Sequence, residues 1–245
     1  MKYEEYGWYS DRLNRYMHIK VYGHYGPAII AFPCQDKQSD DFYNFGMIDT
    51  LSDYLEQGRF KLYCLDANDN ETVSNPSWDK GYAAYKLEQY HQYVVNEVLP
   101  FIYNMQGGYC EPLLIGASMG ASHSANHFFR RPDLFDGFIA LSGSFDLARF
   151  FGGYFDENVY NNSPVHYLRN IDPNHYYINL YNQKKMIAVV GDGAFEYLVK
   201  YTYEEMLQIA NQKGIHIWFN FWDQNATHDW PSWKYEMRYF LDKIL

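Results

Sequence analysis

The chain has 245 residues, 47% of them hydrophobic, so it can bury the core of one large α/β domain or of two small ones. Its formal net charge of −10 argues against nucleic acid as a partner, because nucleic-acid-binding proteins need a basic surface to neutralise phosphates. The three cysteines are too few for a disulfide framework and match no metal-site spacing. We therefore expect neither a bound metal nor a cofactor.

The N-terminal stretch "MKYEEYGWYSDRLNRYMHIKVYG" is polar and acidic, whereas a signal peptide needs an apolar central region. No window approaches the roughly 18 consecutive apolar residues of a membrane span. These features predict a soluble cytoplasmic protein that has no membrane partner. A homo-oligomer is compatible with this size and class.

Short apolar runs alternate with longer helix-like stretches along the chain, which is typical of a mostly parallel sheet. The runs predicted to be strands are residues 16–22, 28–33, 61–66, 112–117, 137–143, 186–191 and 216–222. The predicted helices are residues 82–104, 120–129, 195–212 and 232–244, and Pro100 is expected to kink or end the first of them. Several strands are almost entirely apolar, which favours an α/β fold with helices on both faces of the sheet.

The segment from about 145 to 182 is polar and aromatic and has little periodicity. Such a segment is typical of an insertion over one end of a sheet, where it can form a lid or a wall of a binding site. The sequence contains no internal repeat, low-complexity segment or obvious linker. We therefore predict a single domain, residues 1–245, that carries this lid-like insertion.

A possible nucleophile lies in "LLIGASMGASHSANHFFRRPDLF", where Ser118 stands between Gly116 and Gly120. The Gly-x-Ser-x-Gly pattern alone is weak evidence, because it arises by chance in roughly one chain in ten of this length at average composition. Here a predicted strand precedes the serine and a predicted helix follows it. This strand–turn–helix context is that of a nucleophile elbow, in which glycines allow a sharp turn.

A serine hydroxyl needs a base to take its proton, and His228 is the best-placed of nine histidines. It lies in "NATHDWPSWK", after the last predicted strand and before the last predicted helix. That loop is expected at the carboxyl edge of the sheet, where the elbow also opens. His123 and His127 fall on the helix after the elbow and are better explained as packing or polar surface residues.

The acid that orients the histidine should follow the penultimate strand, and "VVGDGAFEYL" offers Asp192 and Glu196. Each residue also has a structural explanation, because Asp192 could cap a turn and Glu196 could favour the first turn of a helix. Asp229 is adjacent to His228 and is expected to point away from it.

Two backbone amides are needed to bind the oxyanion of an acyl-transfer intermediate. One is expected from Met119, directly after the serine. The other is expected from "FPCQDKQSDD", which follows the second predicted strand, at Cys34 or Gln35. Cys34 would act through its amide and not through its sulfur.

The elbow segment, together with "FPCQDKQSDDFYNFGM", "NPSW", "LSGSFDL", "VVGDGAFE" and "THDWPSW", resembles a family of α/β-hydrolase esterases over nearly the whole chain. This family includes esterase D (S-formylglutathione hydrolase), feruloyl and acetylxylan esterases, enterochelin esterases and mycolyl transferases. The resemblance implies an α/β-hydrolase fold, with Ser118 as nucleophile and His228 as base. The segment from Gly191 to Glu196 matches a "GxGAxE" form of the acid loop, which favours Glu196 over Asp192.

The sequence thus predicts a serine carboxylesterase that acts through a Ser–His–acid triad and an acyl-enzyme on small-molecule or carbohydrate-linked esters. One alternative is an acyltransferase with the same triad, and another is a catalytically silent binding module. Trp78, Tyr154 and Trp230 are candidates for an aromatic-walled substrate pocket, although they could equally belong to the roof of the core.

Overall fold

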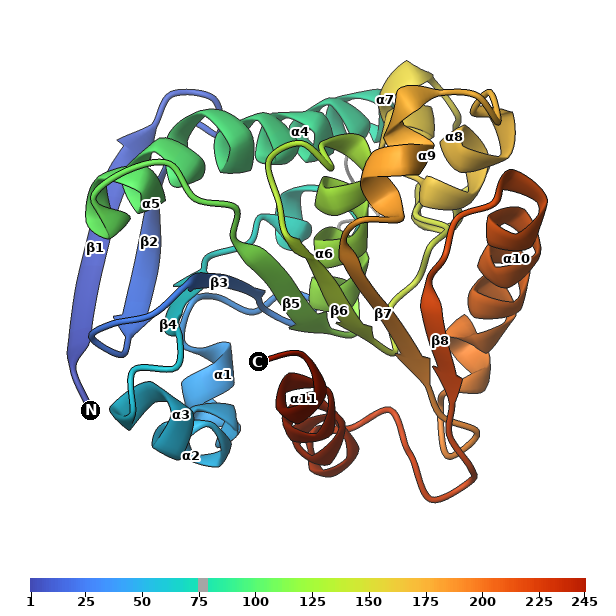
Figure 1. Cartoon of the computed structure of the whole chain (residues 1–245). Coiled ribbons are helices and arrows are strands. Elements are labelled where there is room, and N and C mark those ends of the chain that lie inside the picture. The colour runs from blue at the N-terminus through green and yellow to red at the C-terminus, as the bar shows by residue number, and fades with distance from the viewer. Residues whose placement is uncertain (75–78) are drawn as a thin grey trace.

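The computed structural model describes residues 1–74 and 79–245. Its centre is an eight-stranded sheet in the order β1-β2-β4-β3-β5-β6-β7-β8 (Figure 1). The antiparallel pairs are β1–β2 and β2–β4, and every other neighbouring pair is parallel. The strands are β1 (Tyr3–Ser10), β2 (Arg15–Tyr22), β3 (Ala28–Phe32), β4 (Lys61–Leu65), β5 (Leu113–Ala117), β6 (Gly137–Leu141), β7 (Lys185–Val190) and β8 (Trp218–Phe221).

All seven predicted strands are present, with ends within two residues of the predicted ones. The strand β1 was not predicted from the sequence. It lies at the edge of the sheet, and most of its residues are exposed or half-buried, so it lacks the apolar character by which the other strands were recognised. The prediction of a mostly parallel sheet in an α/β fold is confirmed.

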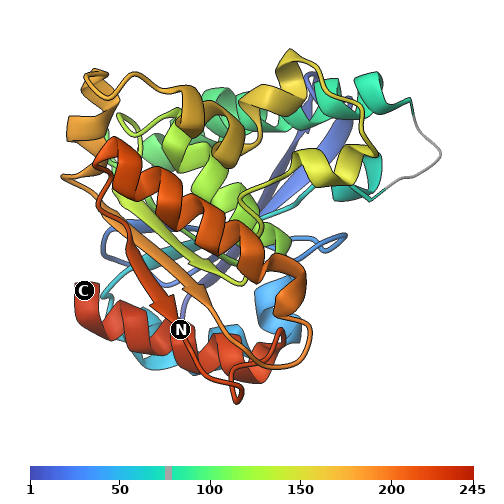
Figure 2. The same cartoon turned by 90° about the vertical axis from the view of Figure 1, so that its right-hand side faces the viewer.

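Helices cover both faces of the sheet, as predicted (Figures 1 and 2). One face packs against α4 (Lys80–Tyr93), α5 (Leu99–Gln106), α6 (Met119–Arg130), α8 (Pro164–Asn170), α9 (Tyr176–Tyr181) and α10 (Tyr197–Lys213). The other packs against α1 (Asp41–Asn44), α2 (Met47–Thr50), α3 (Ser52–Glu56) and α11 (Trp230–Ile244). In Figure 2 the sheet runs between α10 and α11. No helix within the described residues has the length and apolar character needed to cross a membrane.

The chain stays helical through Pro100, because a π-helical turn (Val94–Val98) joins α4 to α5. Proline has no amide hydrogen to donate, and its ring would crowd the carbonyl four residues earlier in a regular α-helix. A wider π turn directly before α5 relieves this conflict, so the chain continues as a helix past the proline.

The segment predicted as an insertion folds into short helices: η3 (Ala148–Phe151), α7 (Glu157–Asn161), α8 and α9. These helices pack against α4, α6 and α10 (Figure 1). Leu147 and Phe151 of this segment share a buried cluster with Met119, the residue after the candidate nucleophile. The insertion therefore lies against the start of α6. Its role as a lid stays a prediction.

Candidate active site

Ser118 lies between the end of β5 and the first residue of α6, in a strained conformation with φ 53° and ψ −123°. Its amide donates to the carbonyl of Leu141 at the end of β6, with an N···O distance of 2.9 Å. A Cβ atom at Gly116 would overlap the backbone of Gly120, and one at Gly120 would overlap the carbonyl oxygen of Phe32. Only glycine fits at these two positions, so the geometry is that of a nucleophile elbow.

Positive φ values are concentrated around this serine. Five non-glycine residues of the described chain have positive φ: Asn14, Asp36, Ser118, Ser142 and Phe195. Asn14 belongs to the β1–β2 hairpin, and Asp36 lies in the loop after β3. Ser142 is hydrogen-bonded to Glu196, and Phe195 directly precedes Glu196 in the sequence. Strained backbone of this kind persists where the surrounding structure fixes it, and it clusters at functional sites.

His228 lies with its Nε2 atom 3.0 Å from Oγ of Ser118, within hydrogen-bond distance, although the residues are 110 positions apart. The backbone amide of His228 donates to the carbonyl of Ala194 (3.0 Å), and the ring packs edge-on against Trp233. The next residue, Asp229, caps α11 by accepting from the amide of Trp230. The histidine is therefore held by the β7–α10 loop on one side and by the start of α11 on the other.

Glu196 lies on the opposite side of the imidazole, with Oε1 3.8 Å from Nδ1 of His228, and only 1% of the residue is exposed. This distance is too long for a hydrogen bond, and Nδ1 of His228 and Oε2 of Glu196 have no hydrogen-bond partner among the described residues. Oε1 instead accepts from the hydroxyl of Ser142 (2.6 Å), which in turn accepts from Nε1 of Trp233 (3.0 Å).

Asp192, the alternative acid, is placed differently. Its carboxylate accepts from Nζ of Lys200 (2.7 Å), and 61% of the side chain is exposed. Within the described residues, the acidic group within ion-pair distance of His228 is Glu196. The structure thus brings Ser118, His228 and Glu196 together and leaves Asp192 on the surface.

Three backbone amides were expected as candidates to bind the oxyanion, and they differ in whether they already donate a hydrogen bond within the protein. The Cys34 amide donates to the buried carboxylate of Asp41 at 2.8 Å, so it is occupied. The amides of Gln35 and Met119 have no acceptor among the described residues. Burial, with Asp41 nearby, raises the pKa of the Cys34 thiol, which therefore stays protonated and cannot serve as a thiolate nucleophile.

The loop that carries Gln35 is held by buried carboxylates that the sequence did not single out. Asp69 accepts from the amide of Asp36 (3.4 Å) and lies 2.9 Å from Nε2 of His123 on α6. Asp66 accepts from the amide of Ser39 (2.9 Å). His123 was predicted to be a packing or polar surface residue, and it is buried. Its pairing with Asp69 ties the Gln35 loop to the helix that follows the nucleophile.

The three aromatic candidates for substrate binding have different outcomes. Trp78 lies outside the described residues. Trp230 is 7% exposed and stacks on Phe45 in the core between the sheet and α11, so it does not form an open wall. Tyr154 is 40% exposed, and its hydroxyl donates to Asp156 (3.1 Å). Of the three, Tyr154 is the one that the structure places on the surface.

The elbow on the carboxyl edge of a mostly parallel sheet, with a histidine at its serine, defines the class of protein as an α/β-hydrolase. Residues 10–241 match the family described as "Putative esterase", and the chain belongs to this family. The family assignment makes it a hydrolase of the esterase class. No curated protein sequence matches the chain.

Several solved structures are similar over almost their whole length. A ferulic acid esterase is 18% identical with a TM-score of 0.73, covering 96% of this chain and 95% of that one. An S-formylglutathione hydrolase from Staphylococcus aureus is 11% identical with a TM-score of 0.71 (98% and 95%). MPT51 from Mycobacterium tuberculosis is 15% identical with a TM-score of 0.67 (97% and 95%). At these identities the likeness establishes the shared fold.

Proposed function

We propose that this protein is a serine carboxylesterase that hydrolyses esters through an acyl-enzyme. The observation that carries the proposal is the 3.0 Å approach of His228 Nε2 to Ser118 Oγ on a strained elbow. A hydroxyl in this position can be deprotonated as it attacks, which is the requirement for serine to act as a nucleophile at neutral pH.

In the proposed reaction, Oγ of Ser118 attacks the carbonyl carbon of the ester while His228 takes the hydroxyl proton. The resulting imidazolium gives this proton to the departing alkoxide, so an alcohol leaves and an acyl-serine remains. His228 then removes a proton from water, which attacks the acyl carbon. Collapse of the second intermediate releases the carboxylic acid and returns the proton to Ser118.

We assign the acid of the triad to Glu196. Its carboxylate lies on the Nδ1 side of the imidazole, so it favours the tautomer in which Nε2 is free to accept a proton. Closing the 3.8 Å separation to hydrogen-bond distance needs a displacement of about 1 Å, which the charge of the imidazolium would favour. The carboxylate of Asp192 is instead paired with Lys200 and does not lie beside the imidazole of His228.

We assign the binding of the developing oxyanion to the backbone amides of Met119 and Gln35. The Met119 amide is at the N-terminus of α6, where unpaired N–H groups and the helix dipole favour negative charge. Gln35 is chosen over Cys34 because the Cys34 amide is already bonded to Asp41. The substrate class that follows is a carboxylic ester, either a free small molecule or an ester on a carbohydrate.

The test is covalent labelling with a small fluorophosphonate, read as intact mass for the wild type, Ser118→Ala and Ser124→Ala. Ser124 is a matched control, because it is a buried serine of α6 whose hydroxyl bonds to Gly120. We expect one adduct on the wild type and on Ser124→Ala and none on Ser118→Ala. Labelling of Ser118→Ala, or ester turnover by it, would contradict the proposal. Product analysis with added alcohols then separates hydrolysis from acyl transfer.

A further inference from the structure

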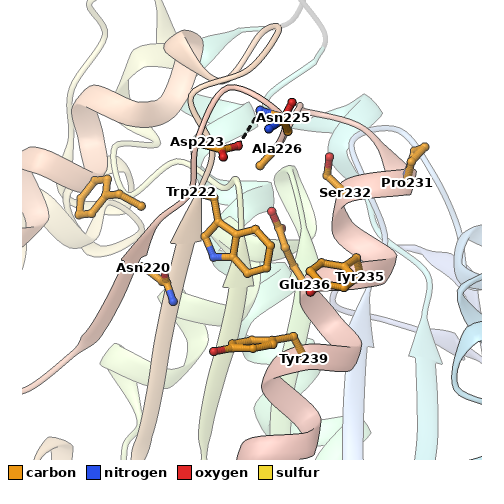
Figure 3. Close-up of a pocket in the computed structure, with 11 residues that line it drawn as sticks. Asn220, Trp222, Asp223, Asn225, Ala226, Pro231, Ser232, Tyr235, Glu236 and Tyr239 are labelled. Carbon is orange, nitrogen blue, oxygen red and sulfur yellow. Dashed lines mark hydrogen bonds between the residues drawn. The ribbon is translucent and has the colours of Figure 1, made fainter.

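A pocket separate from Ser118 lies between the end of the sheet and α11 (Figure 3). It is formed by β8, the loop after it and the first turns of α11, and its volume is about 740 Å³. Pockets of this size are typical of sites for small molecules. The residues that line it are Asn220, Phe221, Trp222, Asp223, Asn225, Ala226, Pro231, Ser232, Tyr235, Glu236 and Tyr239.

Three aromatic rings form much of the wall. The ring of Trp222 lies at 76° to that of Tyr235 and at 86° to that of Tyr239, with centroids 5.5 Å and 5.7 Å apart. In Figure 3 the three side chains gather on one side of the pocket, beneath the loop that carries Asp223 and Asn225. Tyr235 is 63% exposed, so the aromatic surface is open to solvent. Such surfaces pack well against the apolar faces of ligand rings.

Two buried polar atoms of the lining residues have no partner among the described residues. They are Oε2 of Glu236, in a residue that is 1% exposed, and Nε1 of Trp222. Figure 3 shows the Glu236 side chain leaving α11 and running between Trp222 and Ser232 toward Ala226. Buried polar groups in folded proteins are almost always hydrogen-bonded, so these two atoms point to a ligand that completes them.

The charges of the pocket restrict the ligand. Burial and the neighbouring Glu196 raise the pKa of Glu236 to about 8, so at neutral pH its carboxyl is uncharged and can donate a hydrogen bond. Tyr203 of α10 is also coupled electrostatically to Glu236, and the other titratable residues that line the pocket are Asp223, Tyr235 and Tyr239. No lysine or arginine lines the pocket, which disfavours an anion.

The indole N–H of Trp222 can only donate, and the protonated carboxyl of Glu236 can donate through its O–H as well as accept. A ligand that completes both groups therefore brings at least one acceptor oxygen, which an ammonium ion does not have. It must also present an apolar face to the aromatic rings. A sugar ring has both features, with C–H groups on its faces and hydroxyl and ring oxygens at its edge.

We propose that this pocket is a binding site for a neutral sugar ring, which packs on the aromatic wall and accepts hydrogen bonds from Trp222 and Glu236. The amides of Asn220 and Asn225 and the carboxylate of Asp223 at the rim suit the remaining hydroxyls. The site does not include Ser118 or His228, and its link to the proposed esterase reaction is the electrostatic coupling between Glu236 and Glu196.

The first experiment follows the indole N–H resonances by NMR during titration with methyl glycosides of glucose, galactose, mannose, xylose and N-acetylglucosamine. We expect at least one glycoside to shift the Trp222 resonance saturably. Trp222→Ala lacks this resonance, so its affinity is measured by isothermal titration calorimetry beside the wild type, and binding should be at least tenfold weaker. Trp218→Ala is the matched control, because Trp218 is an exposed residue of β8, the strand directly before Trp222, and does not line the pocket, so this variant should bind normally. Thermal melts confirm that the variants are folded.

The second experiment separates a sugar from a cation. Binding of the glycoside to the wild type should weaken as pH rises above about 8, where the Glu236 carboxyl ionises, while folded Glu236→Gln should bind the glycoside with little pH dependence. Choline is the cationic probe, and 3,3-dimethylbutan-1-ol is its uncharged analogue. Saturable binding of choline that strengthens with pH would overturn the proposal. So would the failure of all five glycosides to shift the Trp222 resonance, or loss of glycoside binding at pH 7 in Glu236→Gln.

Discussion

The hydroxyl of Ser142 donates a 2.6 Å hydrogen bond to Oε1 of Glu196, the same oxygen that lies 3.8 Å from the imidazole of His228. This serine is fully buried and has a positive φ of 55°. Trp233, which packs on His228, donates to the hydroxyl in turn. Trp233 and Ser142 therefore hold the proposed acid through two consecutive hydrogen bonds. The residues of this hydrogen-bond chain can be replaced one at a time to test the site.

Replacement of Ser142 by alanine should lower kcat by about tenfold to a hundredfold with little change in KM. The physical reason is the loss of a hydrogen bond to a charged group, worth about 1.5–3 kcal/mol, that orients Glu196. Steady-state kinetics with an ester substrate measure this. Ser142→Cys keeps a weak S–H donor without a branch at Cβ, which the positive φ would disfavour, and should recover part of the activity. A larger effect on KM than on kcat would indicate a role in binding the substrate instead.

Glu196→Gln should lower kcat by about 10³-fold or more, because the imidazolium loses its buried counter-charge. Asp192→Asn should change kcat by less than about twofold, since it only removes an exposed ion pair with Lys200. The two variants are compared by kcat/KM at pH 7. If Asp192→Asn were the inactive one, the assignment of the acid would have to be exchanged.

Asp69→Ala should destabilise the fold by about 3 kcal/mol, because it leaves His123 buried without its partner. It should also lower kcat, since the loop that presents the Gln35 amide loses its attachment to α6. Urea unfolding measures the first effect and ester kinetics the second. The control is Asp136→Ala, which removes an ion pair with Lys185 whose side chains are about 40% exposed. This variant is expected to leave the free energy of unfolding and kcat nearly unchanged. A stable, fully active Asp69→Ala protein would show that the loop is held by other contacts.

The stability of the wild type should fall between about pH 5 and pH 8 through Glu236. The pKa of this carboxyl is raised to about 8 in the folded state, so the folded protein holds a proton that the unfolded chain has released. The stabilisation is therefore present at pH below the ordinary carboxyl range and is lost as pH rises to about 8, by at most about 1.4 kcal/mol per pH unit. Urea unfolding of wild type and Glu236→Gln from pH 5 to pH 8 measures this, and the variant should have the flatter profile. Parallel profiles would mean that Glu236 ionises normally.

The sequence allowed the parallel strands, the elbow and the position of His228 to be predicted, because each depends on local features. Apolar runs identify buried strands, and the glycines around Ser118 report a turn that admits no side chain. The edge strand β1 was not predicted, because a half-exposed strand has no apolar run.

Other features depend on tertiary contacts that local sequence does not encode. Trp230 is an aromatic residue two positions after the histidine, and only its burial in a cluster with Phe42 shows that it belongs to the core. The occupied amide of Cys34 depends on a carboxylate seven residues later. The role of Ser142 depends on Glu196, 54 residues away. The sequence shows a polar residue, Ser142, directly after the strand β6, but it does not show which residue this serine contacts.

The close approach of Gly120 to the carbonyl of Phe32 has a consequence for how this protein can change over time. Met119 lies directly before Gly120 and Gln35 three residues after Phe32, so the proposed oxyanion donors adjoin backbone segments that touch with no side chain between them. Their spacing is therefore set by main-chain contact, which requires glycine at position 120 and does not depend on neighbouring side chains. For the proposed esterase, substitutions outside these two segments can alter which ester is preferred while the spacing of the two amides is kept, so new specificities can arise without loss of the proposed chemistry.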